Sequence, residues 1–238
     1  MQAPAKAMLL AAGEGRRLRP FTDDRPKPMI EIGGRPILEH TVRLLARYGV
    51  RDIAINLHYH PESIVDHFGD GERFGVRIRY SREAELLGTA GAVKKLGSFF
   101  DEPFLVVYGD NLTDIDVERF SEFHRSNHAI ATIALFRREN ATESGIVGVT
   151  DDGRVTRFLE KPKPDEIFSN WVNAGILVAE PAILEHIPAS GPSDFGRDVL
   201  PALLAAGQPV FGYRMTENLY WIDSPEDYQR TQELVGSS

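Results

Sequence analysis

Five basic residues fall within twelve positions, from Arg16 to Lys27, in a chain whose formal net charge is −8. Three prolines and two glycines interrupt the same stretch, "LLAAGEGRRLRPFTDDRPKPM" (9–29), so it cannot be the solvated face of one helix. The stretch begins within "AMLLAA" (7–12), an apolar run typical of a strand buried on both faces. Because open α/β sheets bind ligands beyond the carboxyl ends of their strands, we expect this loop to hold a small anion.

The glycines of the loop favour phosphate. Gly13 and Gly15 allow close backbone approach and offer N–H groups to anionic oxygens. The Walker pattern G-x-x-x-x-G-K-[ST] occurs nowhere, and Leu18 stands where a dinucleotide fingerprint needs its third glycine. Two interpretations remain, a loop that holds a nucleoside triphosphate through arginine and lysine, or a solvated surface cluster of charges.

Length and composition set further limits. The 238 residues suffice for one α/β domain with a large core, and no apolar run reaches the roughly 18 residues of a membrane helix. The start "MQAPAKA" lacks the apolar centre of a signal peptide. The absence of cysteine excludes disulfides and thiolate zinc sites and fits a reducing cytoplasm. The pI near 5.4 argues against a nucleic-acid partner. We therefore expect a cytoplasmic protein with no nucleic-acid or membrane partner.

Strands and helices alternate along the first half of the chain, and mixed strands follow after residue 140. This order predicts an α/β fold, a Rossmann-like doubly wound sheet that is mixed but mainly parallel, in a single domain. We expect a short tail at 1–6 and the domain at 7–235. Expected strands are 7–12, 52–57, 76–80, 103–110, 129–136, a hairpin turning at 152–153, 171–180 and 209–214, and expected helices are 36–48, 61–69, 89–97, 116–125, 181–187, 195–206 and one from 225.

The stretch 9–29 resembles the signature of the sugar-1-phosphate nucleotidylyltransferases, L-A-A-G-x-G-x-R-[LM]-x-P-x-T followed by P-K-P-[LM]. Arg16 stands where that family often has threonine or serine. Six further landmarks recur in the family's order: "ELLGTAGAV" (85–93), "VVYGDN" (106–111), "SGIVGV" (144–149), "EKP" (160–162), "NAG" (173–175) and "YWIDSPEDY" (220–228). The resemblance implies Mg²⁺-dependent in-line attack of a sugar 1-phosphate on the α-phosphorus of an NTP, giving an NDP-sugar and pyrophosphate. It therefore implies NTP and sugar 1-phosphate as the binding partners.

The resemblance assigns catalysis to Arg17, at the β- and γ-phosphates, and to Lys27, at the α-phosphate. It assigns Mg²⁺ to Asp110 and Asp223, a set that suits a cation whose other ligands are phosphates and water. Asp223 has an alternative role as a helix N-cap in "DSPED", where Ser224 could also cap.

The remaining site residues also follow from the resemblance. The nucleotide would contact Ala11, Ala12, Gly13, Gly15, Glu85, Gly88 and Thr89, and the sugar phosphate would contact Gly145, Glu160, Lys161 and Asn173. On local pattern alone, "LGTAG" is equally a glycine-broken helix start. Its form is closest to guanylyltransferases of mannose 1-phosphate or heptose 1-phosphate, so GTP is the favoured nucleotide.

Several alternatives stay open. A uridylyl- or thymidylyltransferase of the same family would differ only in the base, and a non-catalytic nucleotide-sugar-binding regulatory protein would keep the fold. A glycosyltransferase would need a D-x-D metal motif, for which "DID" (114–116) is a candidate. The chain ends soon after its last expected helix, so no C-terminal β-helix domain is expected. The sugar is not determined by the sequence, and a homo-oligomer is compatible with it.

Overall fold

The computed structural model describes residues 3–139 and 141–236, so the first two residues of the expected tail lie outside the described residues. The chain forms two compact units. The N-terminal unit contains Ala5–Leu86, Val107–Ile115 and the chain from Glu217 on, and the central unit contains Leu87–Val106 and Asp116–Thr216. No helix among the described residues is long and apolar enough to cross a membrane.

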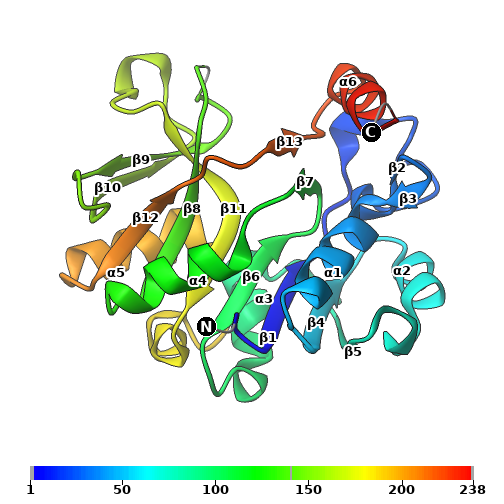
Figure 1. Ribbon diagram of the computed structural model, residues 1–238, viewed down its shortest axis with the longest axis horizontal. Coiled ribbons are helices and arrows are strands. Elements are labelled where there is room, and N and C mark those ends of the chain that lie inside the picture. The colour runs from blue at the N-terminus through cyan, green and yellow to red at the C-terminus, as the bar shows by residue number, and fades with distance from the viewer. Residues whose placement is uncertain (1–2, 140, 237–238) are drawn as a thin grey trace. The chain divides into compact units, whose positions relative to one another are not determined.

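The N-terminal unit is built on three parallel strands in the order β1 (Lys6–Leu10), β4 (Asp52–Leu57) and β5 (Arg77–Arg82). The intervening chain contains α1 (Ile37–Arg47) and α2 (Pro61–Phe68), as the predicted β-α-β order requires (Figure 1). Because all three strands are parallel, their carboxyl ends meet at one edge. The cationic loop leaves the sheet at that edge, where β1 ends.

Four short strands complete this unit and escaped the sequence prediction. They form two antiparallel pairs, β2 (Glu31–Ile32) with β3 (Arg35–Pro36), and β7 (Asn111–Thr113) with β13 (Leu219–Trp221). The last helix, α6 (Pro225–Gly236), lies beside β2 (Figure 1), where the Gln232 amide donates to the Glu31 carbonyl at 2.9 Å. Strands of two or three residues carry too little periodicity to be recognised in a sequence.

The central unit contains α3 (Gly88–Lys95), α4 (Val117–Ser126), α5 (Leu200–Ala205) and most of the later strands. Here β11 (Trp171–Ala179) pairs antiparallel with β8 (Ala131–Arg137) and β9 (Gly145–Val149), β9 with β10 (Val155–Glu160), and β12 (Val210–Arg214) parallel with β8. β6 (Phe104–Tyr108) spans the chain positions where one unit gives way to the other. The hairpin turns at 152–153 as predicted. The expected helix at 181–187 is a 3₁₀ helix, Pro181–His186, and that at 195–206 begins with a π turn, Phe195–Val199.

Candidate active site

The loop after β1 is shaped around Gly15. Gly15 has φ +67°, and a Cβ there would lie 2.7 Å from Lys27 Cβ and 3.1 Å from Thr22 Cγ2. Both the left-handed backbone and the close approach therefore require glycine. The Gly15 carbonyl accepts from the Thr22 hydroxyl at 3.0 Å, which closes the loop. Gly13, by contrast, faces open space, with no atom within 4 Å of its virtual Cβ.

Three of the five basic residues in the loop pair with carboxylates that lie close to them in sequence. Arg16 pairs with Glu14 at 2.6 Å, Arg19 with Asp23 at 3.5 Å and Arg25 with Asp24 at 2.9 Å. Arg16 and Arg19 are exposed and Arg25 is half-buried, and each of the three is paired with a carboxylate close to it in sequence. Arg17 instead reaches Asp223, which lies 206 positions later in the chain, and its Nη2 is 3.4 Å from Asp223 Oδ1.

Lys27 is the buried member of the loop, with a relative exposure of 6%. It begins a 3₁₀ turn, Lys27–Met29, between two prolines, and its Nζ donates to Asp110 Oδ2 and to Asp223 Oδ1, each at 2.8 Å. Burial alone would lower the pKa of Lys27, but the charges and hydrogen bonds of the two carboxylates outweigh it and raise the pKa above its ordinary value. Arg17, Lys27, Asp110 and Asp223, here called the Lys27 cluster, thus form one group of charges.

Antiparallel pairing explains how Asp110 meets Asp223. Asp110 immediately precedes β7, and Asp223 is the second residue after β13. The two strands pair with Asn111 opposite Trp221. A small apolar core supports both loops, formed by the buried residues Leu18, Ile30, Ile32, Ile37, Leu112 and Ile222. Leu18 follows Arg17 in sequence and Ile222 precedes Asp223. Burial of these neighbours fixes the backbone from which the charged side chains project.

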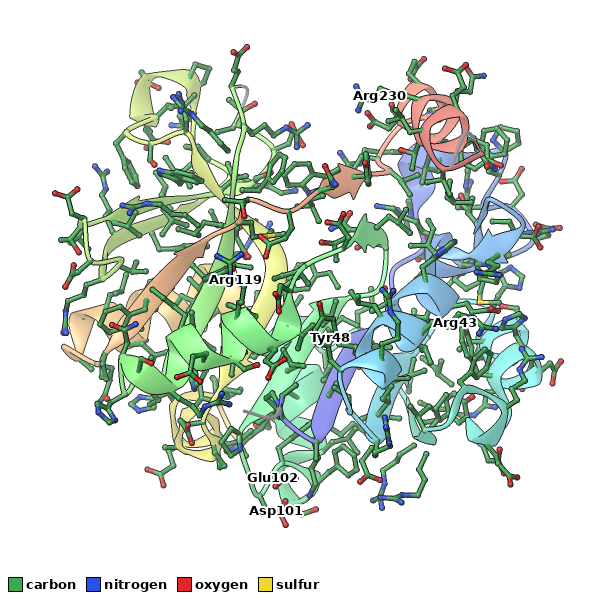
Figure 2. The ribbon with its side chains drawn as sticks, in the orientation of Figure 1. Arg43, Tyr48, Asp101, Glu102, Arg119 and Arg230 are labelled. Atoms are coloured by element: carbon green, nitrogen blue, oxygen red, sulfur yellow. The ribbon has the colours of Figure 1, made fainter. Side chains whose placement is uncertain are left out.

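The cap of α6 is provided by Ser224, the residue after Asp223. The Ser224 hydroxyl accepts from the Asp227 N–H at 3.1 Å, so Ser224 is the capping residue. Asp227 in turn accepts from the Asp223 N–H at 3.3 Å and from Arg230 at 2.9 Å (Figure 2 labels Arg230 on α6). Of the two expected caps, Ser224 is the one the structure shows, while the Asp223 carboxylate contacts Lys27 and Arg17.

Two buried polar residues beside the loop escaped the sequence prediction. Asn56 is 4% exposed, and its Oδ1 accepts from the Ala11 N–H at 2.8 Å while its Nδ2 donates to Glu83 Oε1 at 2.9 Å. Glu83 is 6% exposed, whereas Glu85, predicted at the nucleotide, is exposed. The amide thus links the ends of β1, β4 and β5. A polar residue inside the apolar strand "DIAINL" was the available signal.

In the central unit, the glycines of "LGTAG" serve the start of α3. Gly88 has φ +73°, and a Cβ there would lie 2.5 Å from the Ser193 carbonyl oxygen, which accepts from the N–H groups of Ala90 and Gly91. Thr89 donates to Asp194 Oδ1 through its N–H at 3.0 Å and its hydroxyl at 3.2 Å. This geometry agrees with a glycine-broken helix start, and the nucleotide role of Gly88 and Thr89 stays a prediction.

The predicted sugar-phosphate residues lie in β9, β10, β11 and the turn after β10. Glu160 is half-buried at the end of β10, and its carboxylate has no hydrogen bond or ion pair among the described residues. Burial raises the pKa of the Glu160 carboxyl, although the charges of Lys161 and Arg197 oppose the shift. A half-buried carboxylate without a partner is costly for the protein alone and suits a ligand that brings hydroxyl donors.

The neighbouring predicted residues have special backbones. Lys161 has φ +49°, a left-handed conformation that a non-glycine residue rarely adopts. Asn173 stands where the pairing of β11 with β8 shifts register, and its Oδ1 accepts from the Gly175 N–H at 2.9 Å. Register shifts of this kind often lie next to active sites, where they redirect side chains.

The "DID" segment has structural roles instead. Asp114 accepts from the Asn218 backbone N–H at 2.7 Å and from its side-chain amide at 2.8 Å, and Asp116 caps α4 by accepting from the Arg119 N–H at 3.0 Å. Both carboxylates are engaged, which counts against a D-x-D metal motif. No group of three or more metal-ligating side chains occurs among the residues the structure describes.

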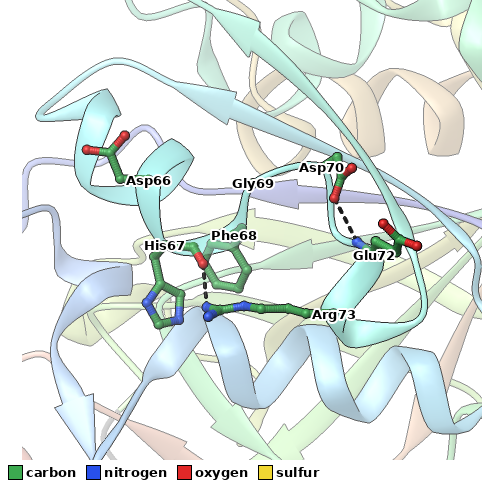
Figure 3. A pocket seen from close by; sticks show the side chains of 7 residues that line it. All are labelled: Asp66, His67, Phe68, Gly69, Asp70, Glu72 and Arg73. Carbon is green, nitrogen blue, oxygen red and sulfur yellow. Dashed lines mark hydrogen bonds between the residues drawn. The ribbon is translucent and has the colours of Figure 1, made fainter.

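A pocket of about 440 Å³ lies near the end of α2, lined by seven consecutive or near-consecutive residues between Asp66 and Arg73 (Figure 3). Its polar groups serve the local turn, because Arg73 donates to the His67 carbonyl and Asp70 accepts from the Glu72 N–H at 3.0 Å. None of the predicted site residues lines this pocket, and we assign it no role.

Comparison with known proteins identifies the fold and the family. Residues 6–233 match the family described as nucleotidyl transferase. This chain belongs to that family. A UTP–glucose-1-phosphate uridylyltransferase of Synechocystis is 38% identical over 232 residues, which cover 92% of this chain and 59% of the relative. A mannose-1-phosphate guanylyltransferase of Mycobacterium tuberculosis is 36% identical over 228 residues, which cover 94% of this chain and 62% of the relative.

A solved Bacillus anthracis structure, assigned as a glucose-1-phosphate thymidylyltransferase and complexed with sucrose, matches with a TM-score of 0.88 at 22% identity. The match covers 98% of this chain and 96% of that one, and it confirms the predicted Rossmann-like α/β fold with a mixed, mainly parallel sheet. The predicted resemblance to sugar-1-phosphate nucleotidylyltransferases is confirmed by the named relatives. This nucleotidyl transferase chain spans about three fifths of the length of those two relatives.

Proposed function

We propose that this nucleotidyl transferase joins an NTP to a sugar 1-phosphate and releases pyrophosphate. The observation that carries the proposal is the Lys27 cluster, in which a buried lysine lies 2.8 Å from each of two carboxylates and an arginine reaches one of them. The nucleophile is a phosphate oxygen that is already ionised at neutral pH, because its second pKa is about 6. Catalysis then depends on position and charge rather than on a general base.

The N-terminal unit would bind the triphosphate. Arg17 would contact the β- and γ-phosphates and stabilise the charge that develops on the pyrophosphate, while Lys27 would contact the α-phosphate. Ala11, Ala12, Gly13 and Gly15 would line the nucleotide site, and the N–H groups of Ala12, Gly13 and Gly15 would face the nucleotide. Asn56 supports this loop by accepting from the Ala11 N–H.

Asp110 and Asp223 fit a divalent cation, because both carboxylates already converge on one positive centre, the Lys27 ammonium. Mg²⁺ commonly takes one or two carboxylates and completes its shell with phosphate oxygens and water. Bound there, Mg²⁺ would neutralise phosphate charge. The central unit would bind the sugar phosphate, with Glu160 and Asn173 accepting from or donating to hydroxyls and Lys161 contacting the phosphate.

GTP is the nucleotide we favour, and the form "LGTAG" and the guanylyltransferase relative support it. UTP is the second candidate, because a relative of 38% identity is named a uridylyltransferase. We place the reaction in the cytoplasm, which a sequence without cysteine fits.

Pyrophosphate release with Mg²⁺ tests the proposal across GTP, UTP, dTTP, CTP and ATP against mannose, glucose and heptose 1-phosphates. One strong GTP combination is the expected result. A strong combination under another base would retain the reaction and replace the base. A folded protein that binds nucleotide but releases no pyrophosphate with any pair would favour the regulatory alternative.

A further inference from the structure

The Glu160 carboxylate occupies a narrow slot between two glycines. A Cβ on Gly145 would lie 2.6 Å from Glu160 Oε2, and a Cβ on Gly196 would lie 2.5 Å from the same oxygen and 3.2 Å from Cδ. The ring of Phe158 closes the slot, 2.5 Å from the virtual Cβ of Gly145 and 3.4 Å from that of Gly196. Real Cβ contacts are not this short, so neither position accepts a side chain while the carboxylate stays in place.

Gly196 lies outside the seven motifs quoted from the sequence, and its own backbone conformation does not require glycine. It lies within the π turn Phe195–Val199, and its φ is outside the left-handed region. π turns often mark functional sites. The neighbouring Asp194 accepts from Thr89 and holds this turn against the start of α3. The close approach of the Glu160 carboxylate, rather than the conformation of the turn, therefore explains the glycine at position 196.

We propose that Gly196 is a positioning residue for the sugar 1-phosphate, because it gives Glu160 the room to face the hydroxyls of a hexose 1-phosphate. This inference rests on the proposed function. The clashing atom is the far end of a flexible side chain, so a methyl group at 196 moves the carboxylate at little cost to the fold. Its effect falls on the ligand, since a displaced carboxylate cannot accept from the same hydroxyls.

Gly196→Ala tests the proposal, with Gly97→Ala as the matched control. Gly97 also lies in a short helical turn of the central unit without a left-handed φ, and its virtual Cβ has an ordinary 3.7 Å contact with Leu184. We expect Gly196→Ala to raise the KM for the sugar 1-phosphate about tenfold or more, the effect of losing one hydrogen bond to a charged group. The KM for the NTP and the melting temperature should stay close to wild type, as should all three values in Gly97→Ala.

A double variant isolates the route of the effect. In a Glu160→Ala background the carboxylate is gone, so adding Gly196→Ala should change the sugar KM less than twofold. An unchanged sugar KM in the single variant would overturn the inference, and so would equal losses for both substrates or a full effect in the double variant. A wild-type protein without turnover would contradict the proposed function and the role of Gly196 with it, whereas an active wild type with an unaffected Gly196→Ala contradicts the inference alone.

Discussion

The Lys27 cluster and the Glu160 slot treat carboxylates in opposite ways. In the N-terminal unit, Asp110 and Asp223 each lie 2.8 Å from a buried ammonium. In the central unit, Glu160 has no cation or hydrogen-bond donor in contact among the described residues, and burial raises its pKa. A site for charged phosphates and a cation can keep its charges paired until the ligand arrives. A site for neutral hydroxyls has no such internal partner, so its acceptor, here Glu160, makes no hydrogen bond to another described residue until a ligand binds.

Substitution of two adjacent arginines, Arg16 and Arg17, should give the largest effect and tests the account of the Lys27 cluster. Arg17→Ala removes the guanidinium that reaches Asp223, and we expect turnover to fall about 10²–10³-fold, the usual effect of losing one charge-stabilising donor. Arg16→Ala should stay within about twofold of wild type, because Arg16 is bonded to Glu14 and exposed. Pyrophosphate release measures both. Equal losses in the two variants would show that the loop acts only through its overall charge.

Asn56→Ala tests whether the cationic loop after β1 depends on its buried support. The substitution leaves the Ala11 N–H and the Glu83 carboxylate without the amide, so we expect unfolding to cost about 1–3 kcal/mol less free energy. The NTP KM should rise more than the sugar KM, since only the N-terminal loop loses its support. Urea unfolding and steady-state kinetics measure these effects, with the exposed Asn170→Ala as control. A larger change in the sugar KM would contradict the assignment.

Glu160→Gln should give the smallest effect on stability. We expect this substitution to stabilise the fold, because Glu160, unlike the carboxylates of the Lys27 cluster, has no partner among the described residues. The folded-state pKa of Glu160 lies above its ordinary value of 4.5, so the ionised carboxylate destabilises the fold above that range, and the penalty disappears as pH falls through the folded pKa. At pH 7 the variant should therefore unfold at slightly higher urea concentration than wild type while binding sugar phosphate less well. Below pH 4.5 the difference in stability should vanish. Glu185→Gln, an exposed carboxylate of the same unit, serves as control, and a less stable Glu160→Gln at pH 7 would refute this account.

Periodicity and order predicted much of this molecule. The apolar run after Lys6, the helix from Ile37 and the hairpin turning at Asp152 and Gly153 all carry a local signal, and each forms where expected. The motif residues Arg17, Lys27, Asp110 and Asp223 also meet, because the family's residue order encodes a shared geometry.

The features that could not be predicted from the sequence depend on contacts between distant segments. Asn56 and Glu83 look ordinary until the parallel strands bring their ends together. No local pattern marks Gly196, because the need for glycine there comes from the Glu160 carboxylate, 36 positions earlier in the chain. The short strands β7 and β13 pair across more than a hundred residues, and such pairing leaves no periodic trace in either segment.

The Mg²⁺ dependence of pyrophosphate release is the most direct test of the Lys27 cluster as the reaction centre. Wild type should be compared with Asp110→Asn, Asp223→Asn and Asp66→Asn, the last an exposed carboxylate on α2. We predict that Asp110→Asn and Asp223→Asn each lose at least about 10²-fold in turnover at any Mg²⁺ concentration, with Asp66→Asn unchanged. Full turnover in either of the first two variants at ordinary Mg²⁺ would contradict the account.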